Sequence, residues 1–278
     1  MRAFLIVLNV LILVALGLAA ILFVRGVHID ENVVFLPVQR PDRVELAIRG
    51  EGTLGDHVQH KRALLGNETI AITTVGPDVG PLIVSCFGNA SDRYAHGVDY
   101  ANKIAPFGQV LVWDYPGYGD SSGAAGVVAI EDVADEFVAL VEDRAAGRPI
   151  IYWGHSLGGF VCSNLAGRAT QVDAVILETT AQSIRSVAKA WTPMGIPIRV
   201  TFNEDLLRFD IPDALANLDR PILIIGAGRD RVLPVELARE LAEAMPQATY
   251  LELPQATHFS AGFDPKAQAA VAKLLARP

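Results

Sequence analysis

The most constraining stretch of this sequence is residues 149–158, which read PIIYWGHSLG. An apolar, β-type run that begins at Ile150 leads directly into GHSLG, and a helix is predicted over Gly159 to Ala169. A strand that turns sharply into a helix places the middle residue, Ser156, in a strained backbone geometry and exposes its hydroxyl, while the flanking glycines relieve crowding. The stretch therefore predicts a nucleophile elbow with Ser156 as the nucleophile. The alternative is a tight turn without chemistry.

A second Gly-x-Ser-x-Gly match, at residues 119–123, shows how little the bare pattern establishes. It does not follow an apolar run, and the residues before it, 114–118, read DYPGY, which favours turns. Ser121 is therefore interpreted as part of a polar loop that follows a strand. The position of Ser156 at the end of a predicted strand selects it instead.

Composition and charge narrow the class of protein. A chain of 278 residues can form one large α/β domain with a sizeable core. The net charge of −8 and the lack of a Lys/Arg cluster argue against a nucleic-acid partner. Cys86 and Cys162 lie in apolar segments predicted as strand and helix, and we expect buried free thiols rather than a disulfide.

The N-terminal stretch, residues 3–24, is uncharged and almost wholly apolar, and as a helix it would span roughly 33 Å, enough to cross a bilayer. We therefore expect an uncleaved transmembrane anchor over 1–26, followed by one folded domain over 27–278. A cleaved signal peptide is the alternative, but the run is long for one, and no Ala-x-Ala site precedes Arg25. This anchor predicts a single-pass membrane protein. The slight excess of positive charge on the side of Arg2 and the amino terminus places that side in the cytoplasm and the folded domain outside it.

The rest of the chain predicts an α/β fold, with a mostly parallel, doubly wound sheet and antiparallel strands at its N-terminal side. Alternating apolar segments separated by glycines predict hairpin strands at Val44–Ile48, Val58–Leu65 and Thr69–Val75. Buried parallel strands are expected at Leu82–Phe87, Val110–Trp113, Ile150–Trp153, Val172–Leu177, Ile222–Ile225 and Thr249–Leu253, with helices such as Ala129–Arg144 and Val235–Met245 between them.

One interval, residues 179–218, is too long for an ordinary connection between two consecutive strands. It carries large apolar side chains, among them Trp191, Phe202 and Phe209. We expect a small cap insertion over the carboxyl edge of the sheet. Its apolar side chains would line an acyl or aryl pocket or pack the cap onto the body.

A serine nucleophile needs an adjacent base, which in turn needs an orienting acid. Of the six histidines, only His258 lies in a loop between the last predicted strand and the last helix, at the sheet edge where Ser156 also stands. Asp230 follows the strand 222–225, and we predict that it is the orienting acid, although it could instead form a helix cap or an Asx turn. Glu178, at the end of another strand, is the competing acid.

Acyl transfer also needs hydrogen-bond donors for the oxyanion that develops on the carbonyl oxygen. We expect one donor from the backbone N–H of Leu157, directly after the nucleophile. The second donor is predicted to be the backbone N–H of Asn89, in the loop after the strand 82–87. This chemistry requires neither a metal nor a cofactor.

With these motifs in this order, the chain from about Asn32 to its end resembles the α/β-hydrolase superfamily. Within it, the chain is similar to the membrane-anchored abhydrolase-domain branch, which includes protein depalmitoylases and lysophospholipid lipases. The resemblance rests on the elbow and on FGNA at 87–90, DYPGYG at 114–119, LET at 177–179 and GRDRVLP at 228–234. It departs at Phe87, where that branch usually has histidine, and so loses a polar side chain beside the oxyanion loop.

The residues and the resemblance together predict a membrane-tethered serine hydrolase that cleaves carboxylic esters or thioesters through an acyl-enzyme. The expected substrate is a small or lipid-like molecule with an apolar acyl group, and the oligomeric state is left open. An amidase or peptidase on the same triad is an alternative, as is a non-catalytic interaction module with a hydrolase fold. Cofactor-free perhydrolysis or halogenation is a further alternative.

Overall fold

The computed structural model describes residues 26–38, 58–94, 100–101, 104–192 and 199–276. The predicted anchor at 3–24 and the predicted strand at Val44–Ile48 lie outside these residues. The remaining predicted strands and helices all fall within the described part of the chain.

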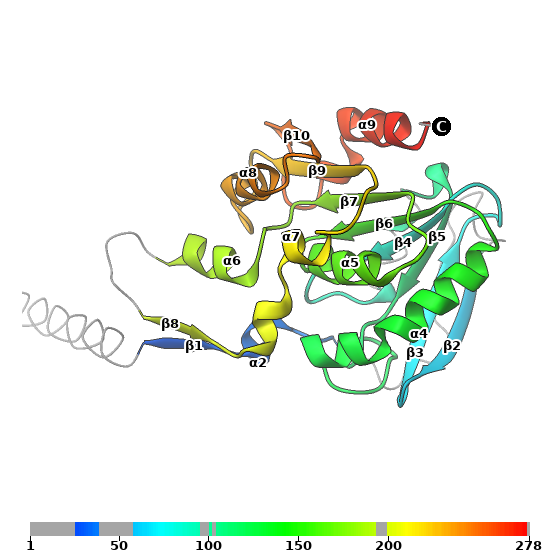
Figure 1. The fold of residues 1–278 in the computed structure, drawn as a ribbon, viewed down its shortest axis with the longest axis horizontal. Coiled ribbons are helices and arrows are strands. Elements are labelled where there is room, and N and C mark those ends of the chain that lie inside the picture. The colour runs from blue at the N-terminus through cyan, green and yellow to red at the C-terminus, as the bar shows by residue number, and fades with distance from the viewer. Residues whose placement is uncertain (1–25, 39–57, 95–99, 102–103, 193–198, 277–278) are drawn as a thin grey trace, which may run out of the picture.

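Within that part, the main sheet has eight strands in the order β10-β9-β7-β6-β4-β5-β3-β2 (Figure 1). Neighbouring strands from β10 to β5 pair in parallel, whereas β3 pairs antiparallel with both β5 and β2. This confirms the expected parallel sheet with antiparallel N-terminal strands. The strands are β2 (Gln59–Leu65), β3 (Glu68–Val75), β4 (Leu82–Cys86), β5 (Gln109–Trp113), β6 (Ile150–His155), β7 (Ala174–Glu178), β9 (Ile222–Ala227) and β10 (Thr249–Leu253).

The strand order reverses direction at β4, because the chain passes from β4 to β5 on one side and then returns to β6 on the other. Such switch points leave a crevice at the carboxyl ends of the strands, where ligands bind in open α/β sheets. The loops after β4 and β6, which carry Asn89 and Ser156, both open at this edge. The topology therefore brings two of the predicted site residues together.

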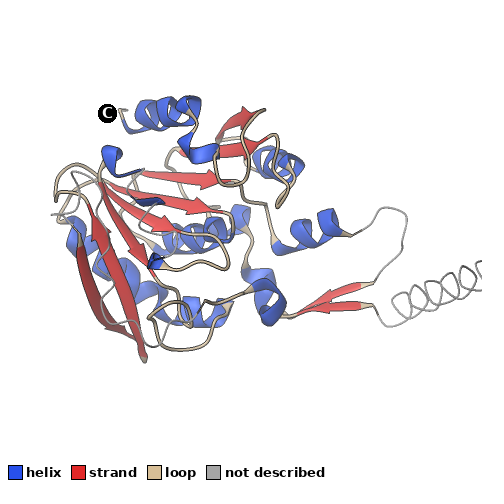
Figure 2. Ribbon diagram, turned by 180° about the vertical axis from the view of Figure 1, so that it is seen from behind, coloured by secondary structure: helices blue, strands red, loops and turns tan. Residues whose placement is uncertain are grey.

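Helices cover the sheet on its faces. Helices α4 (Val127–Ala145) and α5 (Leu157–Arg168) pack against each other over one face, in front of the strands in Figure 1 and behind them in Figure 2. Helix α8 (Val235–Ala244) packs on β9, and α9 (Pro265–Leu275) packs along β9 and β10. Helix α5 begins two residues earlier than predicted, because the elbow turns directly into it.

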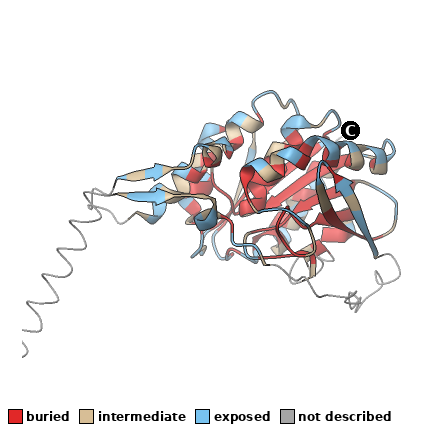
Figure 3. Cartoon of the chain, turned by 90° about the horizontal axis from the view of Figure 1, so that it is seen from below, coloured by how far each residue is buried: buried red, intermediate tan, exposed pale blue. Residues whose placement is uncertain are grey.

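The core lies between the sheet and these helices (Figure 3). Large aromatic side chains fill it, and Trp113 of β5 stacks on Phe137 of α4 with ring centroids 4.1 Å apart. Burying such side chains removes large apolar surfaces from water and is the main stabilising contribution to folding. The strands beneath the carboxyl edge of the sheet are therefore held in a dense, apolar interior.

Between β7 and β9, the described residues 179–192 and 199–218 lie outside the main sheet and contain short elements. These are α6 (Ile184–Trp191), β8 (Val200–Phe202), the 3-10 turn η4 (Asp205–Arg208) and α7 (Ile211–Ala214). Strand β8 pairs in parallel with β1 (Val27–Ile29), which precedes the short helix α2 (Glu31–Val34). The β1–β8 ribbon extends away from the body (Figure 3) and was not predicted from the sequence.

The expectation of two free thiols is wrong, because Cys86 and Cys162 form a disulfide with a Cα–Cα distance of 5.8 Å. Cys86 ends β4, and Cys162 lies on the face of α5 that packs on that strand. Both side chains are buried, as expected, but their helix-over-strand packing brings the sulfur atoms into bonding range. The bridge links the end of β4, at the base of the loop that carries Asn89, to the helix that follows Ser156.

The predicted single-pass membrane localisation, with an extracytoplasmic domain, also requires correction. Among the described residues, no helix combines the length and the apolar character needed to cross a membrane.

Candidate active site

Ser156 occupies the sharp turn between β6 and α5 that the sequence predicts. Its backbone has φ 56° and ψ −121°, a left-handed φ that non-glycine residues rarely adopt. The flanking glycines are required sterically, since a Cβ at Gly154 would lie 2.3 Å from the Gly158 carbonyl oxygen, and one at Gly158 would lie 1.9 Å from that of Cys86. The local sequence therefore permits this turn, and larger side chains would prevent it.

Hydrogen bonds from β7 and its following loop stabilise the strained turn. The N–H of Ser156 donates to the Glu178 carbonyl oxygen at 2.9 Å, and the Thr180 hydroxyl donates to the Ser156 carbonyl oxygen at 2.8 Å. The Ser156 side chain borders an open cavity. Ser156 thus lies at the wall of a cavity, on a backbone that is fixed on both sides.

Asp230 and His258 lie in direct contact at the same edge. His258 Nδ1 lies 2.7 Å from Asp230 Oδ2, and the two side chains are only 5% and 1% exposed, respectively. The other carboxylate oxygen, Oδ1, accepts the backbone N–H groups of Val232 and Leu233 at 2.8 Å each. This pairing fixes the imidazole with Nδ1 toward the carboxylate, which leaves Nε2 to act on a substrate or a nucleophile.

Glu178, the competing acid, faces a different set of donors. Its carboxylate accepts hydrogen bonds from the Tyr100 hydroxyl, from Trp153 Nε1 at 3.0 Å and from the N–H of Gly262 at 2.7 Å. None of these bonds involves the imidazole of His258. Of the two candidate acids, Asp230 is the one that the structure pairs with His258.

The backbone of His258 is held by a second histidine. His155, the residue before Ser156, has Nε2 2.9 Å from the His258 carbonyl oxygen, and the two rings lie 4.9 Å apart. Because a carbonyl oxygen can only accept, His155 carries its proton on Nε2. Burial lowers the pKa of His155, which keeps the ring neutral. Sequence reasoning gave this residue no role, since no pattern within the elbow indicates where its side chain points.

Asn89 lies in the loop after β4 and borders the same cavity as Ser156 and Leu157. Its side chain is fully engaged, because Oδ1 accepts from the Leu36 N–H and the Tyr118 hydroxyl, both at 2.9 Å, and Nδ2 donates to the Val34 carbonyl. These contacts fix the loop without using the backbone N–H predicted as an oxyanion donor. Leu157 begins α5, so its N–H lies at a helix N-terminus, where partial positive charge favours an anion.

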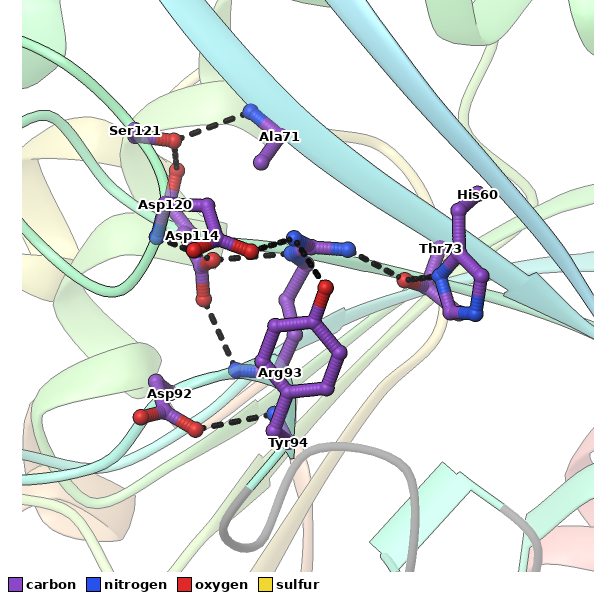
Figure 4. Close-up of polar contacts among 9 residues, drawn as sticks. All are labelled: His60, Ala71, Thr73, Asp92, Arg93, Tyr94, Asp114, Asp120 and Ser121. Carbon is purple, nitrogen blue, oxygen red and sulfur yellow. Dashed lines mark hydrogen bonds and ion pairs between the residues drawn. The ribbon is translucent and has the colours of Figure 1, made fainter. Parts of the chain in front are cut away.

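A buried arginine holds the far end of this loop, and no sequence signal pointed to it (Figure 4). The Arg93 backbone N–H and Nε donate to the two oxygens of Asp114 at 2.7 and 2.8 Å, and Nη2 reaches Asp120 at 2.7 Å. Nη1 donates to Thr73 at 2.7 Å. Burial is the largest single influence and would lower the pKa of Arg93, but Asp114, Tyr94 and Asp120 together raise that pKa above its ordinary value, so the guanidinium stays charged. The cluster ties the loop after β4 to β3 and to the loop after β5.

Ser121, from the second Gly-x-Ser-x-Gly match, belongs to this polar region. Its hydroxyl donates to the Asp114 carbonyl oxygen at 2.7 Å and accepts the Ala71 N–H at 2.9 Å (Figure 4). Both contacts are to backbone atoms. The structure thus agrees with the interpretation of Ser121 as part of a polar loop.

An apolar cavity of about 450 Å³ extends from the serine. Its walls come from the elbow, from the N-terminal segment of β1 and α2, from α6 and β8, and from the loop that follows Asp230. It is lined by Val27, Ile29, Val33, Val34, Leu36, Asn89, Ser156, Leu157, Phe160, Ile184, Val187, Ala188, Trp191, Thr192, Val200, Val232 and Leu233. Such a cavity can hold a hydrocarbon chain beside a reacting carbonyl group.

Comparison with known families shows that residues 82–204 match the model of the family described as serine aminopeptidase, S33. The chain is 29% identical over 187 residues to lysophosphatidylserine lipase ABHD12 of Danio rerio, covering 62% of this chain and 49% of that protein. It is 30% identical over 184 residues to an uncharacterised protein of Mycobacterium tuberculosis, covering 64% of this chain and 63% of that protein. The chain therefore spans about half the length of the lipases that it resembles.

Solved structures share the fold. The esterase Pf2001 of Pyrococcus furiosus superposes with a TM-score of 0.62 at 17% identity, covering 85% of this chain and 98% of that one. Est1E from Butyrivibrio proteoclasticus superposes with a TM-score of 0.59, also at 17% identity, over 78% and 99% of the two chains. At this level of identity the likeness establishes the architecture.

Proposed function

Because this chain belongs to the α/β-hydrolase superfamily, in its abhydrolase-domain branch, we propose that it is a serine hydrolase of the esterase or lipase type. The proposed substrate is a carboxylic ester or thioester with an apolar acyl group. One observation carries the proposal: the 2.7 Å contact between His258 and Asp230 lies at the sheet edge where Ser156 borders an apolar cavity.

In the proposed mechanism, the Ser156 hydroxyl attacks the carbonyl carbon while Nε2 of His258 takes its proton. Asp230 accepts the Nδ1–H bond and stabilises the imidazolium that forms. The N–H groups of Leu157 and Asn89 would donate to the oxyanion. The imidazolium returns the proton to the leaving alcohol or thiol, and a water molecule, activated by the same histidine, then hydrolyses the acyl-enzyme.

The cavity walls support an acyl chain rather than a polar group as the buried part of the substrate. Each methylene that leaves water for such a site contributes about 0.8 kcal/mol. Relatives of this chain are lysophosphatidylserine lipases, and we extend to this chain only the lipid-like character of their substrate. Residues 179–218 would act as the cap, since α6 and β8 supply one wall of the cavity.

The proposal is tested by labelling the purified protein with a fluorophosphonate probe, with Ser156→Ala and Ser121→Ala as matched variants. Labelling that is lost only in Ser156→Ala is the expected result. Labelling that persists in Ser156→Ala would place the reactive serine elsewhere. A folded wild-type protein that is not labelled at all would favour a non-catalytic interaction module.

Peptide-bond cleavage on the same residues is the second candidate, because the matched family is described as serine aminopeptidases. The apolar walls around Ser156 favour esters, since a free α-amino group would need a carboxylate nearby. A panel of p-nitrophenyl esters against aminoacyl p-nitroanilides separates the two. Faster turnover of the anilides would replace the ester proposal with the peptidase.

A further inference from the structure

Glu178 is a fully buried acid that the proposed mechanism does not use. Its side chain has no solvent exposure and lies beneath the active site, where the Tyr100, Trp153 and Gly262 donors converge on its two oxygens. Burial and the adjacent Glu178 carboxylate raise the pKa of Tyr100 well above its ordinary value, so the phenol keeps its proton and donates it. All three partners therefore act as donors, which only an acceptor at residue 178 can satisfy.

Glu178 contacts both reacting segments of the site. Its backbone carbonyl oxygen accepts the Ser156 N–H at 2.9 Å, so residue 178 holds the nucleophile's turn. Its carboxylate oxygen Oε1 accepts the N–H of Gly262 at 2.7 Å, four residues after His258 in the same loop. One residue is thus bonded to the serine through its backbone and to the histidine loop through its side chain.

The next residue reinforces this connection. Thr179 has φ 44°, a left-handed value that is unusual for a β-branched residue. Its hydroxyl donates to the His258 carbonyl oxygen at 3.3 Å, and its N–H donates to the Ile225 carbonyl oxygen at 2.9 Å. Because Ile225 belongs to β9, which leads to Asp230, the end of β7 is joined to all three proposed catalytic segments.

The contact between Glu178 and Gly262 leaves no space between them. A Cβ at Gly262 would lie 2.4 to 2.8 Å from the carboxyl atoms of Glu178, well inside van der Waals contact. The loop can therefore approach the carboxylate this closely only with glycine at position 262. Because three donors hold this buried carboxylate, a methyl group at position 262 must displace either the carboxylate from its donors or the loop that carries His258.

We infer that Glu178 is a positioning residue that sets the distance between Ser156 and the His258 imidazole. This inference rests on the proposed function, because it assigns a role within that site. Displacement of a catalytic group by about 1 Å can lower the rate of the chemical step by about a hundredfold without changing substrate binding. A loss of kcat with an unchanged KM is therefore the signature of this role.

The test compares Gly262→Ala and Glu178→Gln with the wild type on a p-nitrophenyl ester. In Gly262→Ala we expect kcat to fall about tenfold or more, KM to stay within about twofold, and the fluorophosphonate labelling rate to fall in parallel. Glu178→Gln turns an amide N–H₂ toward one of the three donors, so kcat should again fall while KM stays nearly unchanged. If Gly262→Ala does not fold, Glu178→Gln carries the test.

A matched control separates positioning from a loss of stability. In Gly167→Ala the added Cβ would lie 2.2 Å from the Ala214 backbone carbonyl oxygen, a clash at least as severe as that at Gly262 but located on α5, away from the histidine loop. It should lower Tm and leave kcat unchanged. In the double variant Glu178→Asp/Gly262→Ala, the shorter acid makes room for the methyl group, and we expect kcat to recover at least threefold over Gly262→Ala.

The outcomes are read in sequence. A wild-type protein that does not hydrolyse the ester refutes the proposed function before any variant is compared. If the wild type is active, a kcat in folded Gly262→Ala or Glu178→Gln within about twofold of its value overturns the positioning role alone. A fall in kcat for Gly167→Ala equal to that for Gly262→Ala would also overturn it, because stability would then explain both.

Discussion

Replacing Asp230 with asparagine changes little in shape but reverses one hydrogen bond to His258. Asp230 Oδ1 accepts two backbone N–H groups, from Val232 and Leu233, at 2.8 Å each. In the asparagine variant these donors select the amide oxygen for that side, so the amide N–H₂ replaces Oδ2 and faces His258 Nδ1. The imidazole must then accept at Nδ1 and carry its proton on Nε2, where it can no longer act as a base.

The size of the expected fall in kcat follows from the two backbone N–H groups that Asp230 accepts. Turning the amide round to restore the productive tautomer would leave both N–H groups without an acceptor, at a cost of about 1–3 kcal/mol each. A penalty of about 2–6 kcal/mol leaves at most a few per cent of molecules in the productive tautomer, so kcat should fall by a factor between about 30 and about 10⁴. Folding should be almost unaffected, because the variant keeps the size of the side chain.

The assay is steady-state hydrolysis of a p-nitrophenyl ester by Asp230→Asn, with Tm measured alongside. A matched control is Asp210→Asn, which alters a helix-capping acid in the 179–218 interval. A kcat for Asp230→Asn within about tenfold of the wild type, in folded protein, would refute the tautomer reasoning and would reopen the question of which acid serves His258.

Three further predictions follow from other parts of the structure. Arg93→Met leaves Asp114 and Asp120 buried without their cation. The free energy of unfolding, measured by urea denaturation, should therefore be lower by about 3–5 kcal/mol than in the wild type. A decrease of less than about 1 kcal/mol would contradict this prediction. Burial lowers the pKa of His155 below 6.5, so in acid the unfolded chain takes up a proton at this residue that the folded chain does not. The free energy of unfolding should therefore fall as pH drops below 6.5, and it should fall less steeply in His155→Gln. An equally steep fall in the variant would contradict this prediction. Ala188→Phe places a large side chain from α6 in the apolar cavity. The value of kcat/KM should then fall roughly fourfold for each methylene of the acyl chain that the new side chain excludes. If kcat/KM depends on acyl-chain length across p-nitrophenyl esters as it does in the wild type, the acyl group binds elsewhere.

Local sequence patterns were sufficient for the sheet and for the residues gathered at its edge. Buried parallel strands form continuous apolar runs, and the loop after each run must open at the carboxyl edge. Asp230 and His258 follow two such runs, which is why their contact could be anticipated from a single sequence. The elbow glycines likewise constrain the backbone locally, so the strained φ of Ser156 was predictable.

Features that depend on contacts between distant segments were not predictable. The pairing of Cys86 with Cys162 requires the register of α5 on β4, which no local pattern specifies. Arg93 reads as an ordinary polar loop residue until the fold surrounds it with Asp114 and Asp120. The hydrogen bond between Glu178 and Gly262 was likewise not predictable, because 84 residues separate the two in sequence.

The β1–β8 ribbon has a thermodynamic consequence. Strand β1 belongs to the N-terminal segment and β8 to the interval 179–218, yet residues of both line one cavity. A ligand that binds only when both walls are in place must stabilise their pairing by the free energy of its own binding, and the pairing must raise the ligand's affinity by the same factor. Occupancy of the cavity and docking of the N-terminal segment are therefore reciprocally coupled equilibria.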